Sequence, residues 1–217
     1  MVQATPLVRL TVVDRVADLL RDEILSGRIP LGVALREEQI ADGVGASRHT
    51  VRTAFNRLAA ERILVALPYR GVRVAELDPA QILEMQQLRA ALESEAVRIA
   101  NARFGSGWPP AVTAPAKQAL TRLARLAAAD SDDWLAVERA HADFHAALVS
   151  ASGNARIVEA HEALKSELLL FLLHVRPHYS LTELVDEHRA LLTDVQQRGA
   201  DAVHEHLAHS TALLLGD

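Results

Sequence analysis

The sequence contains no cysteine, and this absence removes several kinds of chemistry at once. Disulfide bonds, thiolate nucleophiles, and zinc or iron–sulfur sites with cysteine ligands are all excluded. Any metal ion in the protein must therefore be held by nitrogen and oxygen ligands.

Long apolar runs are missing as well. The longest covers residues 168–173, which is far shorter than the ~20 residues that a helix needs to cross a bilayer. The first thirty residues are interrupted by charges and lack the apolar segment of a secretion signal. These features predict a cytoplasmic protein with no membrane partner.

Over the whole chain, 23 basic residues are outnumbered by 28 acidic ones, which gives a formal net charge of −5, and the positive charge is unevenly distributed. Residues 1–75 carry eleven arginines and eight acidic residues (+3), whereas the remainder carries twelve basic and twenty acidic residues (−8). Because local charge decides whether a surface approaches a phosphate backbone, the N-terminal part is the one suited to nucleic acid. The length allows one or two domains, and this asymmetry favours two.

Residues 47–58 combine the start signal of a helix with one apolar and one basic face. Ser47 can cap the helix by accepting a hydrogen bond from a backbone N–H. Three apolar residues then fall at i, i+4 and i+7: Val51, Phe55 and Leu58. Three arginines lie on other faces: Arg48, Arg52 and Arg57. Guanidinium groups pair with phosphates and guanine edges, so this helix is a candidate for DNA recognition, with an ordinary solvated face as the alternative.

The flanking segments complete a supersecondary arrangement. The expected elements are helices at residues 12–25 and 35–41 and β-type runs at residues 63–65 and 72–74. Gly43-Val44-Gly45 predicts the turn into the basic helix, and Pro68-Tyr69-Arg70-Gly71 predicts a hairpin with a basic tip. Two short helices joined by such a turn and followed by a hairpin are typical of a winged helix-turn-helix.

The residues of this segment follow one family pattern, L-x-E-x-x-[LI]-A…S-R-x-x-V-R-x-A…L-x-x-E, as Leu35, Glu37, Ile40, Ala41, Ser47, Arg48, Val51, Arg52, Ala54, Leu58 and Glu61. A wing pattern, R-G-x-x-V, follows as Arg70, Gly71 and Val74. Residues 35–74 therefore resemble the winged helix-turn-helix of GntR-type bacterial transcription regulators. One departure is Arg62, where the family usually has glycine, and an altered turn into the wing is expected there.

The resemblance implies a homodimer whose two winged domains each place the helix that starts at Ser47 in a major groove of a palindromic operator. Arginines of this helix would contact bases or nearby phosphates, and the wing would hold the flanking backbone. The residues expected to contact DNA are Arg36, Ser47, Arg48, His49, Thr50, Arg52, Arg57, Arg70 and Arg73.

From residue 79 onward the pattern is helical throughout. Asp78-Pro79 provides a cap followed by proline at the first helical position, which predicts domains at residues 1–77 and 78–217. The helices expected in the second domain are residues 79–103, 110–129, 132–151, 154–176, 181–198 and 200–215. The predicted fold is mostly α: an N-terminal winged helix-turn-helix and a C-terminal antiparallel all-α bundle of about six helices.

Four short motifs mark the second domain: Leu88-Arg89-x-x-Leu92-Glu93, Phe144-His145, Gly153-Asn154 and Glu187-His188-Arg189. Together they are similar to the FCD-type effector domain of the FadR-like GntR subfamily, although this similarity is looser than the first. Nine of the ten histidines also lie in this domain. Neutral imidazole is a good ligand for zinc, nickel or manganese, so a divalent metal is expected.

FCD-type domains that bind metal use an aspartate and a histidine at i and i+4, a histidine in an E-H-R segment, and a histidine on the final helix. His145 and His188 match two of these positions, and His141 occupies the aspartate position. By the usual spacing the last position falls on Ser210, with His209 one residue before it. The metal ligands expected from the resemblance are His141, His145, His188 and His209.

The identity of the fourth ligand is open. A shift of one residue rotates a side chain by ~100° about the helix axis, so His209 reaches the site only if the last helix is re-phased. His206, one turn before Ser210, is a further alternative. The competing hypothesis is that His145 and His188 are hydrogen-bonded core residues around a metal-free pocket.

Arg89 lies between the apolar residues Leu88 and Leu92, and a buried arginine requires an anionic partner. The partner could be Glu93 or Glu95 within the same helix. It could instead be the carboxylate of a small organic acid, which is the effector class that the resemblance suggests.

These features predict a ligand-responsive, sequence-specific DNA-binding transcription regulator that senses a small organic acid. A helical metalloenzyme is one alternative, although only Glu138-x-x-His141 fits the paired Glu-x-x-His motif of di-iron bundles. A constitutive DNA-binding protein whose helical half only dimerises is the other.

Overall fold

The computed structural model describes residues 10–67, 71–175 and 180–215. The chain divides into two compact units, with the division between Glu76 and Leu77. The described part of the first unit contains three helices and three short strands, and that of the second contains seven helices. Across these ranges, no helix is both long and apolar enough to cross a membrane.

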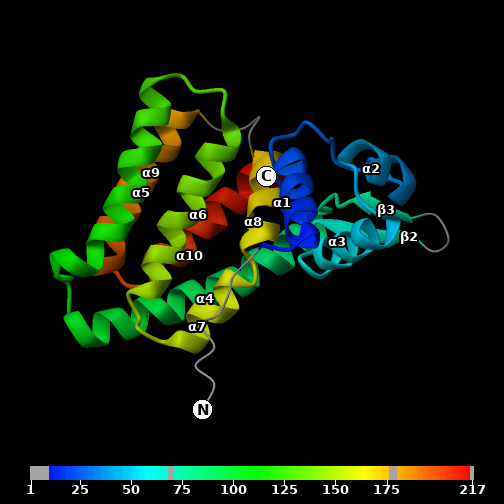
Figure 1. Ribbon diagram of the computed structural model, residues 1–217. Helices are drawn as coiled ribbons and strands as arrows, with labels where there is room; N and C mark the ends of the chain where they lie inside the picture. Colours follow the sequence, from blue (N-terminus) through cyan, green and yellow to red (C-terminus); the bar gives the residue numbers. More distant parts are fainter. Residues whose placement is uncertain (1–9, 68–70, 176–179, 216–217) are drawn as a thin grey trace, which may run out of the picture. The chain divides into compact units, whose positions relative to one another are not determined.

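The N-terminal unit has the architecture of a winged helix-turn-helix (Figure 1). Its elements are α1 (Val12–Leu25), β1 (Ala34–Leu35), α2 (Glu37–Val44), α3 (Arg48–Ala60), β2 (Leu64–Leu67) and β3 (Gly71–Val74). The strands form one antiparallel sheet in the order β1-β3-β2. Because α3 packs against both α1 and α2, its apolar side is covered and most of its polar side chains are exposed.

Strand β1 differs from the expected helix over residues 35–41. Leu35 pairs with Val72 in the sheet and its side chain is buried, so that α2 begins only at Glu37. A two-residue strand has no periodicity, and only its pairing partner defines it. The same strand accounts for the glycine of the wing pattern, because a Cβ at Gly71 would lie 2.8 Å from the Leu35 carbonyl oxygen.

The turn between α3 and β2 is where the sequence departs from the family pattern. Arg62 has a φ of 59°, a left-handed conformation that glycine adopts freely and that costs other L residues about 1–2 kcal/mol. The N–H of Ile63 donates to the carbonyl of Leu58 across this turn, at 3.0 Å. The turn therefore has a backbone geometry that favours glycine, although arginine occupies it.

The C-terminal unit consists of helices, as the sequence predicts. They are α4 (Pro79–Phe104), α5 (Pro110–Ala128), α6 (Trp134–Ser150), α7 (Ala155–Glu162), α8 (Lys165–Val175), α9 (Leu181–Gln197) and α10 (Ala200–Leu215). The expected helix over residues 154–176 is divided into α7 and α8 by a turn at Ala163 and Leu164. No glycine or proline marks this turn, whereas the other five helices agree with expectation within two residues at each end.

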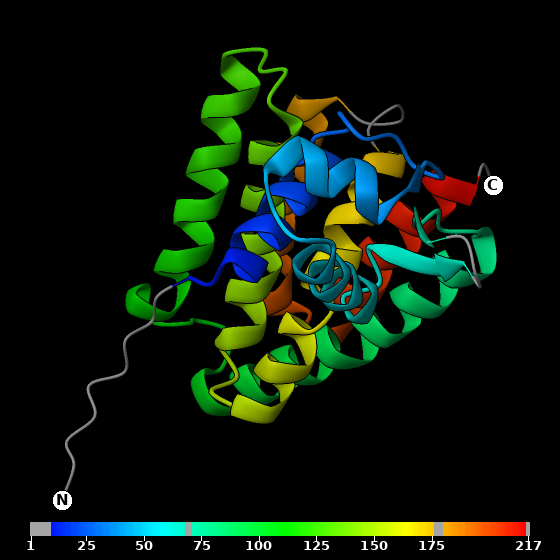
Figure 2. The same cartoon turned by 45° about the vertical axis from the view of Figure 1, so that its right-hand side comes forward.

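The helices of this unit enclose an apolar core and a buried polar centre. α5 packs against α6 and α9, and α10 packs against α4 and α9 (Figure 2). The largest group of buried apolar side chains comes from α4, α5, α6, α9 and α10 and includes Val97, Leu123, Phe144, Leu148 and Val195. In contrast to an ordinary amphipathic helix, α4 also buries four polar residues. Three of them lie at i, i+3 and i+7, namely Gln86, Arg89 and Glu93, and the fourth is Ser94.

Candidate functional site

The first candidate site is the exposed face of α3. The Ser47 hydroxyl caps the helix by accepting a hydrogen bond from the Thr50 N–H at 3.1 Å, and the Ser47 and Thr50 hydroxyls lie 2.9 Å apart. The side chains of Arg48 and Arg52 are 62% and 60% exposed. His49 next to them is also exposed. The face therefore presents two guanidinium groups to solvent.

Both of these arginines are paired with acids from the first turn of α2. Arg52 donates from Nε and Nη2 to the two carboxylate oxygens of Glu37, at 2.8 and 2.7 Å, and Arg48 pairs with Glu38. The hydrogen bonds from Arg52 lower the pKa of the Glu37 carboxyl. Exposed ion pairs contribute only about 0–1 kcal/mol each, so a phosphate group can replace the carboxylate at little cost.

The other arginines expected at DNA have different surroundings. Arg57 pairs with Asp14 of α1, and its Nε lies 3.4 Å from the Glu61 carboxylate, so it ties α3 to α1. Arg36 at the start of α2 and Arg73 on β3 are exposed. Arg70 lies outside the described residues.

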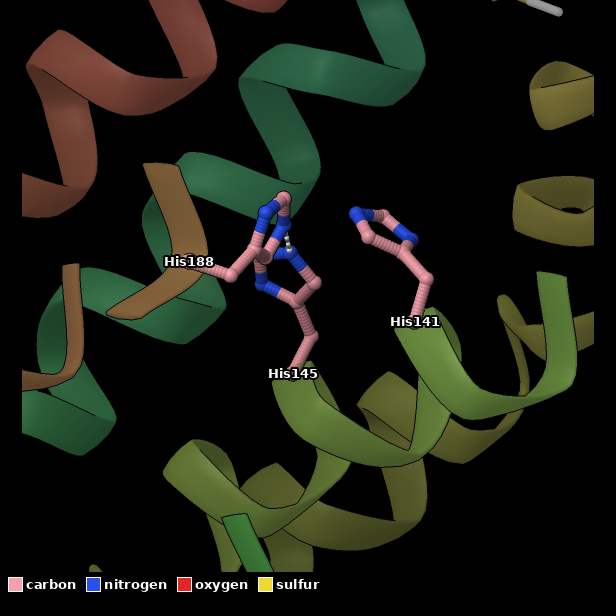
Figure 3. Close-up of side chains that lie close together, drawn as sticks. All are labelled: His141, His145 and His188. Carbon is pink, nitrogen blue, oxygen red and sulfur yellow. Dashed lines mark hydrogen bonds between the residues drawn. The ribbon is translucent and has the colours of Figure 1, made fainter. Parts of the chain in front are cut away.

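The second candidate site is a histidine cluster in the C-terminal unit. His141 and His145 project from α6 and His188 from α9, and Figure 3 shows the three rings converging. One possible ligand nitrogen of each lies within 4.8 Å of the others. All three side chains are buried. Together they could hold a metal ion, as the sequence predicts for these three histidines.

Hydrogen bonds at the far side of two rings fix their tautomers. Nδ1 of His145 lies 2.8 Å from Glu93 Oε2, and Nδ1 of His188 lies 2.6 Å from the Leu184 carbonyl oxygen. A carboxylate and a carbonyl accept hydrogen bonds but cannot donate them, so both Nδ1 atoms carry the proton. The two Nε2 atoms, 3.2 Å apart (Figure 3), therefore present lone pairs to each other.

The charge state of the cluster also suits a metal ion. Burial lowers the pKa of the His145 imidazole to about 4, and burial also lowers the pKa values of His141 and His188 well below the ordinary range. The rings are thus neutral at pH 7, which is the state that ligates metal. Zn–N bonds of ~2.0–2.1 Å place two tetrahedral ligands ~3.3 Å apart, close to the observed separation of the two Nε2 atoms. These residues fit a divalent metal.

The structure does not bring His209 to this cluster. Its side chain is 55% exposed and its Nε2 lies 3.3 Å from Glu187 Oε1. The histidine of α10 that lies beside the cluster is His206, whose ring centroid is 4.7 Å from that of His188. The reason is the phase of the helix, since a position one turn from Ser210 keeps the same face whereas a neighbouring position does not. Ser210 itself accepts a hydrogen bond from Gln86 Nε2 at 3.2 Å.

Arg89 lies in the same buried region. Its Nε donates to Glu93 Oε1 at 2.7 Å and its Nη1 donates to Gln86 Oε1 at 3.2 Å. Its Nη2 is buried and has no hydrogen-bond partner among the described residues. The expected ion pair with Glu93 is therefore present, whereas Glu95 pairs instead with Arg98. The Nη2 donor remains available to a further acceptor.

Two members of this network, Gln86 and His161, were not singled out by the sequence. Both are buried, and Nε2 of His161 lies 3.3 Å from Glu93 Oε1. The only sequence signal for Gln86 is its spacing of three residues before Arg89 on the same helix face. His161 lies on α7, and no sequence motif around it indicates that it reaches this site.

A winged helix-turn-helix with exposed arginines, joined in one chain to a helical unit with a buried histidine cluster that could hold a metal ion, defines a class of protein: DNA-binding regulators with an effector domain. Residues 12–74 match the family described as "Bacterial regulatory proteins, gntR family", and residues 84–212 match the FCD domain. The chain therefore belongs to the GntR family of transcription regulators and carries an FCD domain.

Two relatives agree with this assignment. A Paenarthrobacter nicotinovorans protein named "Probable D-xylose utilization operon transcriptional repressor" is 31% identical over 210 residues, which cover 96% of this chain and 89% of the relative. The HTH-type transcriptional repressor GlaR of Escherichia coli is 28% identical over 206 residues, covering 87% of this chain and 89% of GlaR.

Solved structures also share the fold. A GntR transcriptional regulator from Rhodococcus sp. RHA1 has a TM-score of 0.79 at 26% identity, covering 94% of this chain and 97% of that one. E. coli McbR/YncC has a TM-score of 0.70 at 20% identity, covering 96% and 97%, and this likeness concerns the fold alone. The family assignment makes the protein a DNA-binding transcription regulator and not an enzyme.

Proposed function

We propose that the protein is a repressor that holds a divalent metal in its helical unit and responds there to a small organic acid. The single observation that carries this proposal is the buried cluster of His141, His145 and His188, because two of its Nε2 lone pairs face each other without a proton between them. Repression is supported by the two relatives above, both of which are named repressors. Bacterial DNA lies in the cytoplasm, so we place this regulator there.

We infer that residues 1–77 bind DNA and residues 78–217 bind the effector and pair two subunits. In a homodimer, each α3 would enter a major groove of a palindromic operator. The residues proposed to contact bases or phosphates are Ser47, Arg48, His49, Thr50 and Arg52 on the helix, with Arg36, Arg70 and Arg73 at the flanking backbone. Arg57 is left out of this set because its partners, Asp14 on α1 and Glu61 directly after α3, give it a structural role.

The metal site would be formed by three neutral imidazoles. When bound, the ion would supply positive charge and open coordination positions for an oxygen ligand of the effector. Imidazole ligands suit zinc and nickel better than manganese, which prefers carboxylates, so the replacement of aspartate by His141 favours zinc or nickel. His206 is the residue of α10 best placed to complete the set.

Arg89 is the proposed partner of the effector carboxylate. Its Nη2 is a buried donor with no hydrogen-bond partner among the described residues. A buried donor without a hydrogen bond costs about 1–3 kcal/mol of stability. A carboxylate that reached Nη2 would satisfy it. If the effector favours one of two arrangements of the dimer, affinity for DNA changes by the coupling free energy, typically ~1–3 kcal/mol.

Thermal unfolding of the full chain tests this function. We expect zinc to raise Tm, a chelator to remove that increase, and some members of a panel of small carboxylates to raise Tm further, because a ligand of the native state must stabilise it. His188→Ala should abolish the response to zinc, whereas the matched variant His209→Ala should retain it. Absence of any shift with metals and carboxylates would instead favour a constitutive DNA-binding protein.

A further inference from the structure

Glu93 lies at the junction of the proposed metal and effector sites, although neither proposal above assigns it a role of its own. It is 1% exposed at the middle of α4. Its Oε2 faces Nδ1 of His145 at 2.8 Å, and its Oε1 is 2.7 Å from Arg89 Nε and 3.3 Å from His161 Nε2. One buried carboxylate thus contacts residues of α4, α6 and α7.

The contact with His145 decides which ring nitrogen carries the proton. A carboxylate has no hydrogen to donate, so Nδ1 of His145 must be the donor and Nε2 must keep its lone pair. With the opposite tautomer, the Nδ1 lone pair would face a carboxylate oxygen at 2.8 Å, which is repulsive. A carboxylate that orients an imidazole in this way also makes the ring a stronger base toward a metal.

The contact with Arg89 makes this requirement specific to a carboxylate. Arg89 Nε can only donate, so whatever occupies position 93 must offer it an acceptor. In a glutamine, the single carbonyl oxygen would face Arg89, which turns the amide NH2 toward His145. That amide would donate to Nδ1 and move the ring proton to Nε2, where it blocks the metal.

We propose that Glu93 is a positioning residue, which holds His145 in the tautomer that a metal requires while it restrains Arg89. This inference rests on the metal site proposed above. It assigns Glu93 a task beyond neutralising the buried arginine, since neutralisation alone would be indifferent to the tautomer of His145.

Zinc affinity of the full chain tests the inference, measured by competition with a chromophoric chelator. We expect Glu93→Gln to weaken zinc binding by about 10–100-fold, and Glu93→Asp, which keeps the charge, to recover part of the loss. The matched control is Glu95→Gln, which removes an exposed carboxylate paired with Arg98 on the same helix and should leave zinc affinity unchanged. Equal zinc affinity of wild type and folded Glu93→Gln would overturn the role of Glu93 and leave the metal site standing.

Should Glu93→Gln fail to fold, a second measurement on the wild-type protein decides. Long-range 1H–15N correlations of the metal-free chain should show the His145 proton on Nδ1, and the proton on Nε2 would overturn the inference. A wild-type chain that binds no zinc would refute the metal site itself and the task of Glu93 with it. The two failures can be told apart, because in the first the wild type binds no zinc, whereas in the second the wild type and Glu93→Gln bind zinc equally tightly.

Discussion

Three arginines of this chain show how burial and partners give one residue type three roles. Arg52 is exposed and forms an ion pair with Glu37 of α2, and a phosphate can take the place of that carboxylate at little cost. Arg57 is half-exposed and joins α3 to α1 through Asp14. Arg89 is 2% exposed, is neutralised by Glu93 and keeps one donor free of protein partners among the described residues. From helix periodicity the sequence predicts that Arg52 and Arg57 both contact DNA, and it does not show that Arg57 has a partner on α1.

We expect Arg52→Ala to abolish operator binding without changing helical content, because the lost ion pair is exposed and worth at most about 1 kcal/mol. Arg57→Ala, its matched counterpart on the same helix, should instead lower the free energy of unfolding while operator binding persists. Gel retardation and circular dichroism measure the two effects. Operator-specific retardation by Arg52→Ala would contradict the assignment.

Among the elements, the boundaries that the sequence predicts are those with local chemical signals. Asp78 and Ser180 form capping boxes at the starts of α4 and α9, and Ser47 caps α3. The elements it does not predict, β1 and the division of α7 from α8, carry no such signal. β1 exists because β3 pairs with it, so its position depends on residues distant in sequence.

The left-handed conformation of Arg62, in the turn between α3 and β2, can be tested by substitution. We expect Arg62→Gly to raise the free energy of unfolding by about 1 kcal/mol, since glycine relieves a left-handed conformation, with part of the gain offset by the entropy of glycine in the unfolded chain. Urea unfolding measures the change. Arg62→Ala removes the same side chain but keeps the Cβ, and it should show no comparable gain; equal stabilisation by both variants would assign the effect to the arginine side chain.

In the molecule as a whole, the sequence predicts the convergence of three site residues but not of every residue around them. His141, His145 and His188 come together as predicted, because i, i+4 spacing and a family motif place them. For α10 the sequence expects His209 and keeps His206 as an alternative, and the structure places His206 beside the cluster. His161, which α7 supplies, was not expected there. Such contacts depend on how helices are rotated against one another, and no local pattern contains that information.

The buried histidines make stability depend on pH. Their pKa values are lowered on folding, so the unfolded chain binds more protons once pH falls below ~6.5. In the metal-free protein, the neutral histidines make their full contribution to the free energy of unfolding above pH ~6.5. This contribution is lost as the pH falls from ~6.5 to the pKa of each histidine in the folded protein, which is about 4 for His145. The expected slope is at most about 1.4 kcal/mol per pH unit for each histidine.

Urea unfolding at pH 7 and pH 5.5, in the presence of chelator, checks this expectation. His141→Asn should reduce the difference between the two pH values, because one titrating group is removed. A free energy of unfolding that is the same at both pH values would show that the three rings are not held neutral in the folded protein.

The most direct measurement is the Kd of the full chain for DNA. A duplex is first selected from a randomised library, and its Kd is then measured by fluorescence anisotropy under three conditions. These are zinc alone, zinc with the carboxylate that raises Tm most, and chelator. We expect a palindromic site, and a change in Kd of about 5–150-fold when the carboxylate is added to the zinc-loaded protein. The change should be lost in His188→Ala. A Kd that stays the same in every condition would contradict the claim that the helical unit controls DNA binding.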